Sequence, residues 1–269
     1  MSTLTKFLSE HPVFTAAEFS AFRSHVGSEN PVTHRAMLAQ YESRGRILRV
    51  RRGLYAVVPP GATPETASVD PYLVAAKLAP DAAISHHTAL ELHGYAYSTF
   101  ERYTFLTQTA ARAVQFRGQR FQPVLVPRSL RNQGQEDFGV ASTDRRSQTL
   151  RVTSLERTLV DALARPGLAG GWEETWRSLE SVPYFDLDIV VQYTVLLGGA
   201  TTAAKVGWFL EEHAKRLMTQ PVHLQELREL RPKSPHYVDR NSKQEHRYVR
   251  EWNLVVPSHL ADAPWREVE

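Results

Sequence analysis

The first part of the chain shows apolar residues at helical spacing in short stretches. Residues 3–10 place several apolar side chains on one face, which predicts a short helix. Thr15 and Glu18 have the spacing of a capping box and predict the start of a second helix. Asn30 is a good N-cap residue and is followed by proline, so we expect a third helix that extends to about Ser43.

Two β-rich runs follow the third predicted helix. They cover residues 46–58 and meet at a basic turn around Gly53, which predicts a hairpin. Helices followed by a basic hairpin in this order are typical of a winged helix-turn-helix domain. We therefore predict that residues 1–58 form such a domain. Residues 59–69 are rich in Pro, Thr and Ala and predict a linker.

The remaining residues, 70–269, predict a second and larger domain that begins with short helices and strands. Asp70 and Ser85 are N-cap residues, each at the start of an expected helix. Alternating apolar and polar runs come next, separated by turn residues, and they are typical of an antiparallel sheet. The expected strands cover residues 103–107, 113–116, 121–126, 138–141 and 149–153.

Helical spacing dominates after this block of strands. We expect helices over residues 155–163, 171–181, 189–197, 202–218 and 223–230. A polar tail over residues 232–250 is expected to be loop-like, and a strand is expected over 251–257. Strands first and helices afterwards make the second domain α+β, so the fold class predicted for the whole chain is α+β.

The third predicted helix has one apolar face and one face of small side chains. At about 100° per residue, Leu38 and Tyr41 lie on the first face together with His34 and Met37. A helix that enters the major groove of DNA needs such a division. Arg35 is the best candidate to read guanine, and the apolar side chains suit thymine methyl groups. The expected base contacts from this helix are Val32, Thr33, Arg35, Ala36 and Ala39.

A cluster of arginines begins at the end of the third helix and continues along the hairpin. Residues 1–58 carry a net charge of +4, from eight basic and four acidic side chains. Cations that approach phosphates release counterions, so such a cluster favours nucleic-acid contact, although an isolated run of this kind is equally typical of a solvated loop. The expected phosphate or minor-groove contacts are Arg44, Arg46, Arg49, Arg51 and Arg52.

Composition excludes several other classes of protein. The chain has 269 residues and no Cys, which excludes a disulfide scaffold, a cysteine-ligated zinc site and a cysteine nucleophile. The N-terminus lacks the pattern of a secretory signal. The longest uncharged stretch, residues 189–204, is shorter than the roughly 20 apolar residues that span a bilayer. We expect a cytoplasmic protein that does not insert into membranes.

Candidate catalytic or metal-binding patterns are sparse. His86 and His93 share a predicted helix face, but no third ligand stands at a recognisable spacing, so hydrogen-bonding roles are the better interpretation. Asp186 and Asp188 resemble a magnesium-binding pair, yet a helix N-cap explains them better. No phosphate loop, dinucleotide fingerprint or nucleophile elbow is present. We therefore predict no catalytic residue, no metal and no cofactor.

Three segments of the chain together resemble the AbiEi family of antitoxins, from type IV toxin-antitoxin systems. They are residues 45–55 (GRILRVRRGLY), 83–94 (AISHHTALELHG) and 151–163 (RVTSLERTLVDAL). The resemblance implies a transcriptional regulator that represses its own operon at inverted repeats in double-stranded DNA. It also implies that residues 70–269 form an antitoxin domain that counteracts a cognate nucleotidyltransferase toxin without catalysing a reaction.

Two other functions fit parts of the sequence. A nucleic-acid-processing enzyme with a winged-helix targeting module would use the histidine pair and the basic tail between Arg231 and Arg250. A ligand-responsive transcriptional regulator would sense a small molecule in its second domain. The sequence alone leaves open the operator, the oligomeric state and the residues that act on a toxin.

Overall fold

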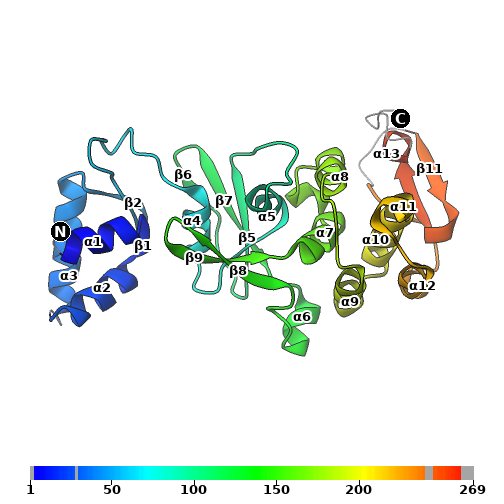
Figure 1. The fold of residues 1–269 in the computed structure, drawn as a ribbon, viewed down its shortest axis with the longest axis horizontal. Helices are drawn as coiled ribbons and strands as arrows, with labels where there is room; N and C mark the ends of the chain where they lie inside the picture. The colour runs from blue at the N-terminus through cyan, green and yellow to red at the C-terminus, as the bar shows by residue number, and fades with distance from the viewer. Residues whose placement is uncertain (1–2, 28–29, 240–244, 262–269) are drawn as a thin grey trace. The chain divides into compact units, whose positions relative to one another are not determined.

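The computed structural model describes residues 3–27, 30–239 and 245–261 (Figure 1). The protein is α+β, and the described strands form three separate sheets. The chain divides into two compact units and passes between them several times. The first unit consists of Met1–Ile84, Glu101–Leu125 and Ala141–Val152, and the second of Ser85–Phe100, Val126–Val140 and Thr153–Glu269.

The N-terminal part of the first unit contains three helices and a small antiparallel sheet. The helices begin and end close to the expected positions, and β1 is an addition that the sequence did not predict. The sheet has the order β1-β3-β2, with Val13 opposite Ala56. The elements are α1 (Thr3–Glu10), β1 (Val13–Thr15), α2 (Ala16–His25), α3 (Pro31–Ser43), β2 (Ile47–Arg51) and β3 (Leu54–Val57).

Aromatic side chains fill the core between these helices and the sheet. Phe14 and Phe19 are fully buried, and the Phe7 ring packs edge-on against Phe14 with ring centroids 5.5 Å apart. Large rings bury much apolar surface each, which lets so few residues stabilise a small core. Leu38 and Tyr41 contribute the α3 side of this cluster.

The rest of the first unit is built on a six-stranded sheet with the order β6-β7-β5-β4-β9-β8. Helix α4 (Pro71–Ala76) packs beside it and begins at Asp70, whose carboxylate accepts hydrogen bonds from the backbone N–H groups of Tyr72 and Leu73. The strands are β4 (Ala83–Ile84), β5 (Arg102–Thr107), β6 (Val114–Phe116), β7 (Gln119–Leu125), β8 (Val140–Arg145) and β9 (Gln148–Thr153).

The prediction of a purely antiparallel sheet was wrong. Strand β5 pairs with β7 in parallel, and β4 pairs with β9 in parallel, whereas β6–β7 and β4–β5 are antiparallel. Alternation of apolar and polar side chains has the same period in both arrangements, so the sequence pattern does not reveal strand direction. The chain reverses direction between β6 and β7, and β7 then pairs with β5 on its other side. Strand β7 therefore has the same direction as β5.

Helices make up most of the second unit. The expected helix over residues 202–218 is divided in two at His213, where α10 ends and α11 begins. Among the described residues, no helix combines the length and the apolar character that crossing a bilayer would require. The helices are α5 (His86–His93), α6 (Arg128–Gln133), α7 (Leu155–Ala164), α8 (Trp172–Glu180), α9 (Leu187–Leu197), α10 (Ala200–Glu212), α11 (Ala214–Leu217), α12 (Pro221–Leu230) and α13 (Ser258–Ala261), with short 3-10 turns η1 (Pro166–Leu168) and η2 (Arg250–Trp252).

A three-stranded sheet near the C-terminus corrects the prediction of a loop-like tail. Its order is β10-β12-β11, with β10 (His236–Tyr237), β11 (His246–Val249) and β12 (Leu254–Pro257). Residues 240–244 of that predicted loop lie outside the described residues. The expected strand over 251–257 begins as η2 and becomes β12 only at Leu254. Trp252 explains the shift, because its indole is buried against Gly207 and donates a hydrogen bond to Glu211 at 2.7 Å.

Lys205 on α10 is a buried cation in the second unit. Its side chain lies over the Trp172 ring at 5.0 Å, and its ammonium is 3.5 Å from the Ala164 carbonyl oxygen. Burial lowers the pKa of Lys205 to about 8, an effect that the charge of Asp239 partly offsets. The unfolded chain, in which a lysine has its ordinary pKa, binds this proton more tightly than the folded chain does.

The free energy of unfolding is therefore expected to rise as the pH increases through the window from about 8 to the ordinary lysine value. Lys205→Met should abolish that rise, and at pH 7 it should stabilise the protein by up to about 3 kcal/mol. Urea denaturation at several pH values measures both effects. The matched control is Lys215→Met, because Lys215 is exposed on α11. An identical pH dependence in the Lys205→Met protein and the parent would contradict the prediction.

Candidate nucleic-acid interface

Local sequence signals determine where α3 begins and ends. The Asn30 side chain accepts a hydrogen bond from the Val32 backbone N–H at 2.9 Å, and Pro31 occupies the first helical position. Such a cap satisfies a backbone donor that the helix itself leaves free. The helix ends before Gly45, whose φ of +66° lies in the left-handed region that glycine adopts without strain.

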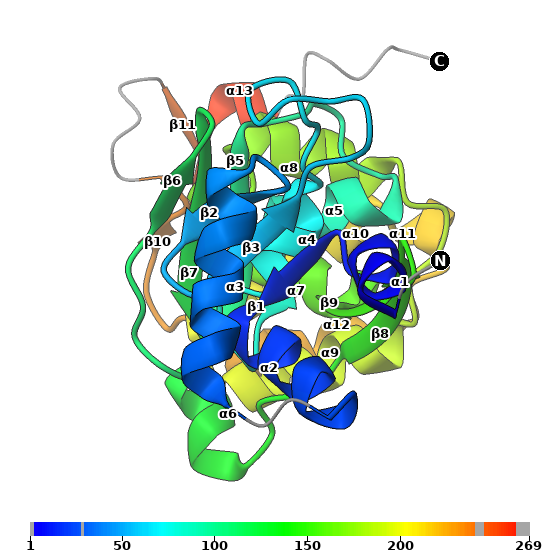
Figure 2. The same cartoon turned by 90° about the vertical axis from the view of Figure 1, so that its left-hand side faces the viewer.

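Helix α3 has one buried and one exposed face, as its spacing predicts. His34, Leu38 and Tyr41 are buried against the aromatic core. The His34 ring lies 2.7 Å from the Ser20 hydroxyl on α2, which ties the two helices together. Val32 is 70% exposed, a large value for an apolar side chain and one that leaves its methyl groups free for a partner. Figure 2 shows α3 standing in front of the small sheet.

The hairpin after α3 is short and tight. Residues 52 and 53 connect β2 to β3, and Gly53 has a φ of +80°. The Gly53 carbonyl accepts a hydrogen bond from the Ala16 backbone N–H at 2.8 Å, so the turn lies level with the start of α2.

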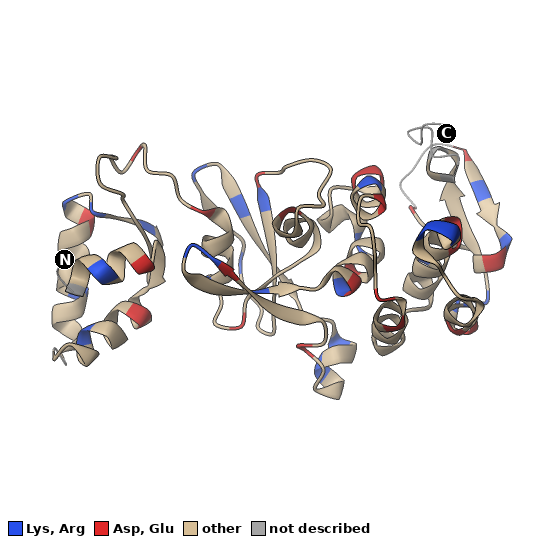
Figure 3. Ribbon diagram, viewed as in Figure 1, with Lys and Arg blue, Asp and Glu red and all other residues tan. Residues whose placement is uncertain are grey.

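The structure leaves every predicted contact residue at the surface. Basic residues colour the ribbon at the C-terminal end of α3 and along the hairpin, whereas most of the α3 ribbon is the colour of uncharged residues (Figure 3). The Arg46 guanidinium lies over the Tyr41 ring at 5.5 Å, which holds the base of its side chain beside α3. The exposed residues are Val32, Thr33, Arg35, Ala36, Ala39, Arg44, Arg46, Arg49, Arg51 and Arg52.

Arg51 differs from the other arginines of the hairpin. Its guanidinium donates a hydrogen bond to the carbonyl oxygen of Leu78, just beyond α4. Nearby, Lys77 forms an ion pair with Glu18, the capping-box residue of α2. The bond to Leu78 occupies one of the five N–H donors of the Arg51 guanidinium, which is otherwise exposed.

The Glu18 carboxylate is stabilised in its charged form. Burial by itself raises the pKa of Glu18, but the hydrogen bond and charge of Lys77, together with the Thr15 backbone N–H, lower the pKa by more. This stabilisation is present above the ordinary glutamate pKa and is lost as the pH falls through the lowered value. The contact between α2 and Lys77 is therefore intact at neutral pH.

Gln40 is a further candidate contact that was not predicted from the sequence. It is exposed on α3, one turn beyond Ala36, and therefore lies on the same helix face. A glutamine side chain can form two hydrogen bonds to adenine in the major groove. The sequence contained the information needed for this assignment, because residues four apart, such as Ala36 and Gln40, lie on the same face of a helix.

The residues considered for metal or catalytic chemistry have structural partners. His86 Nδ1 is 3.0 Å from the Ser85 hydroxyl, and His93 Nε2 is 2.8 Å from the Thr153 carbonyl oxygen. Asp186 caps α9 through the Ile189 backbone N–H, as expected, and Asp188 pairs with His223. Within residues 3–27, 30–239 and 245–261, no three His, Cys, Asp or Glu side chains gather in a way that could hold a metal ion.

Comparison with known proteins identifies a similar fold but no family. No protein-family model matches the chain, and no curated protein matches it. The crystal structure of the RV2827C protein from Mycobacterium tuberculosis is similar, with a TM-score of 0.63 and 19% sequence identity. The match covers 98% of this chain and 94% of that chain. At this level of identity the similarity shows the fold alone.

Proposed function

We propose that residues 1–58 form a winged helix-turn-helix domain and that this domain binds double-stranded DNA through the exposed face of α3. The observation that carries the proposal is the division of α3 into a buried face and an exposed face of small side chains. Support also comes from the order of the helices and of the hairpin, and from the antiparallel β1-β3-β2 sheet beside α3. A recognition helix in the major groove requires this combination.

The exposed face of α3 has the chemistry for reading base pairs. Arg35 offers two parallel donors of the kind that bind guanine, and Gln40 offers the donor and acceptor that bind adenine. Ala36 and Ala39 lack bulk, so the helix backbone can approach the base edges closely. Val32 supplies methyl groups that suit thymine.

Arginines beside α3 are proposed to contact the DNA backbone. Arg44, Arg46, Arg49 and Arg52 are exposed, so their guanidinium groups can reach a phosphate without any rearrangement of the core. Contacts with phosphates set affinity and orientation, whereas base contacts set sequence preference. Arg51 is assigned a mixed role, because its guanidinium already binds the Leu78 carbonyl oxygen.

Beyond DNA binding, we propose that the protein is an antitoxin that represses its own operon and counteracts a nucleotidyltransferase toxin. The support is the resemblance of residues 45–55, 83–94 and 151–163 to the AbiEi family. In this proposal the protein acts in the cytoplasm, catalyses no reaction, and needs no metal or cofactor.

A gel-shift titration tests the DNA-binding proposal. The protein is titrated on the DNA upstream of its own gene and on a scrambled duplex of equal length, each at low and at physiological salt. We expect tighter binding to the upstream DNA, with affinity for both duplexes falling steeply as salt increases. Equal or absent binding to both would overturn the proposal.

The arginines of the hairpin allow a sharper prediction. The double substitution Arg49→Ala and Arg52→Ala should weaken binding to upstream and scrambled DNA alike, and it should reduce the salt slope by about one unit for each phosphate that the variant no longer binds. The matched control is Arg120→Ala, because Arg120 is an exposed arginine on β7 and is not part of the hairpin. An unchanged salt slope in the double variant would exclude the hairpin from the interface.

Co-expression tests the antitoxin proposal separately. The nucleotidyltransferase toxin that the proposal places in the same operon is expressed from an inducible promoter, with and without the full chain. Restored growth only in the presence of the chain would support antitoxin action. Continued growth arrest would contradict it and leave the DNA-binding proposal intact.

A further inference from the structure

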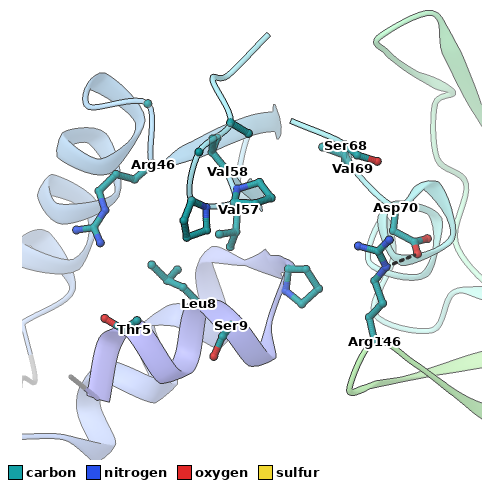
Figure 4. Close-up of a pocket in the computed structure, with 16 residues that line it drawn as sticks. Thr5, Leu8, Ser9, Arg46, Val57, Val58, Ser68, Val69, Asp70 and Arg146 are labelled. Atoms are coloured by element: carbon teal, nitrogen blue, oxygen red, sulfur yellow. Dashed lines mark ion pairs between the residues drawn. The ribbon is translucent and has the colours of Figure 1, made fainter. Parts of the chain in front are cut away.

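A cavity of about 530 Å³ lies within the first unit, beside the N-terminal elements (Figure 4). One wall consists of Leu8 on α1, Pro12, and Val57 at the end of β3. Pro59 and Pro60, from the segment that follows β3, add further apolar surface. The volume falls in the range of about 300–1,000 Å³ that is typical of small-molecule sites.

Interactions at both ends hold the segment that borders this cavity. At its start, the Val57 and Val58 backbone N–H groups donate to the carbonyl oxygens of Pro12 and Arg46, each at 2.9 Å. Further along, the Arg117 guanidinium donates to the carbonyl oxygens of Pro64 and Ala67. The cavity is therefore formed by fixed walls, and a ligand that enters it has little chain to order.

The polar end of the cavity carries an excess of positive charge. The Asp70 carboxylate is buried and already accepts bonds from two backbone N–H groups and from Arg145, whose Nε is 2.7 Å away. Arg146 Nε lies farther from the same carboxylate, at 3.4 Å, and the Arg146 side chain is 60% exposed. One carboxylate thus faces two guanidinium groups, and Arg146, which lines the cavity, is the cation that Asp70 does not fully neutralise.

The backbone under Arg146 indicates that its side chain matters. Arg146 and Ser147 form the two-residue turn between β8 and β9, with φ values of +46° and +63°. Turns with positive φ at both positions strongly favour Asn-Gly or similar pairs. An Arg-Ser pair therefore carries a conformational cost at this turn, which places Arg146 at the tip of the β8–β9 hairpin.

We propose that this cavity binds small amphipathic carboxylates. The apolar part of the ligand, an aromatic or branched aliphatic group, packs between Leu8, Val57 and the prolines. The carboxylate pairs with the Arg146 guanidinium, whose planar set of N–H donors matches the two oxygens of a carboxylate. None of the residues proposed to contact bases on α3 lines the cavity, whereas Arg46, a proposed phosphate contact, does. Binding of a carboxylate does not depend on the proposed function, because it can be measured without DNA.

Direct binding measurements on the full chain without DNA test this proposal. The probes are 2-naphthylacetate and the uncharged 2-(2-naphthyl)ethanol, each followed by isothermal titration calorimetry. We expect the carboxylate to bind at least about tenfold more tightly than the alcohol. Arg146→Gln should remove this preference by weakening the binding of the carboxylate alone.

Two further variants separate the cavity from the rest of the surface. Ser9→Trp places a large side chain on the exposed face of α1 that lines the cavity and should weaken the binding of both probes. Arg120→Gln removes an exposed arginine that does not line the cavity and should change neither affinity. Thermal unfolding verifies that each variant remains folded.

The proposal would be overturned by three results. The first is the absence of naphthylacetate binding at millimolar concentration. The second is equal affinity for the two probes. The third is a carboxylate affinity that neither Arg146→Gln nor Ser9→Trp changes, because the probe would then bind elsewhere.

Discussion

Replacing Arg157 with alanine is expected to lower the free energy of unfolding by about 3–5 kcal/mol, the largest effect we predict for any single stability variant. Arg157 lies on α7 and its side chain is fully buried. Nη1 donates to the carbonyl oxygens of Phe138 at 2.5 Å and Glu136 at 2.9 Å. Removal of the guanidinium leaves both acceptors, which belong to half-buried residues, without that donor.

The substitution also exposes a second problem, at Asp161. The Asp161 carboxylate is 3.5 Å from Arg157 Nε and accepts a hydrogen bond from the Tyr193 hydroxyl at 2.8 Å. Burial, and after it the charge of Asp161, raises the pKa of Tyr193 well above its usual value, so the phenol remains a neutral donor. In the alanine variant the Asp161 carboxylate would lose Arg157 Nε and keep the Tyr193 hydroxyl as a donor. It would then be a buried negative charge without its cation.

Urea denaturation followed by circular dichroism measures the loss. The control is Arg165→Ala, because Arg165 is exposed at the end of the same helix and should change stability by less than about 0.5 kcal/mol. A double-mutant cycle with Tyr193→Phe gives the coupling through Asp161. A loss below about 1 kcal/mol in the Arg157 variant would show that its acceptors find other donors.

Arg157 illustrates what the sequence could and could not predict. Arg157 and Asp161 are four residues apart, the spacing at which opposite charges on a helix pair, and the structure contains this ion pair. That spacing is also typical of exposed helix faces. The partners that bury the pair, Phe138 and Tyr193, are 19 and 32 residues away from Arg157 and Asp161 respectively. No local pattern contains this information, so the pair could be predicted but its burial could not.

The same distinction applies to the proposed DNA-binding region. The faces of α3 follow from a cap at Asn30, a proline and a helical period, all of them local, and the sequence predicted them well. The contact of Arg51 with Leu78 joins residues 27 positions apart, so Arg51 could not be distinguished from the other arginines by its sequence neighbours. The prediction of strand direction in the six-stranded sheet was wrong for the same reason, because pairing between distant segments determines whether strands are parallel.

The cavity beside α1 could not be predicted from the sequence either. Residues 59–69 were predicted to form a linker, and their composition supports that interpretation. Composition does not reveal that Arg117, in the β6–β7 turn, binds two carbonyl groups of this segment. Once that contact is formed, the segment becomes a fixed wall of the cavity.

Ala39→Glu is the variant expected to affect DNA binding most. Ala39 is exposed on the α3 face that we propose enters the major groove. A glutamate there would add bulk between helix and base edges and place a negative charge close to phosphates. Like charges at an interface cost several kcal/mol, so we expect affinity for the upstream DNA to fall at least about a hundredfold.

Two matched variants separate the causes of this loss. Ala39→Gln adds nearly the same bulk without charge, so it should reduce the preference for upstream over scrambled DNA while leaving binding to scrambled DNA largely intact. Gln225→Glu makes a similar change of charge on the exposed surface of α12 and should have little effect. Glutamate and glutamine both favour helices, so α3 should fold in each variant, which circular dichroism verifies.

Gel-shift titration of the three variants on both duplexes distinguishes base reading from general attraction. If Ala39→Glu bound upstream DNA as tightly as the parent does, α3 would not enter the groove, whatever the hairpin contributes. If Ala39→Gln and Ala39→Glu lost equal affinity for both duplexes, bulk alone would explain the loss. A greater loss with glutamate, on upstream and scrambled DNA alike, is the result that a helix close to phosphates requires, because the added charge meets the backbone of any sequence.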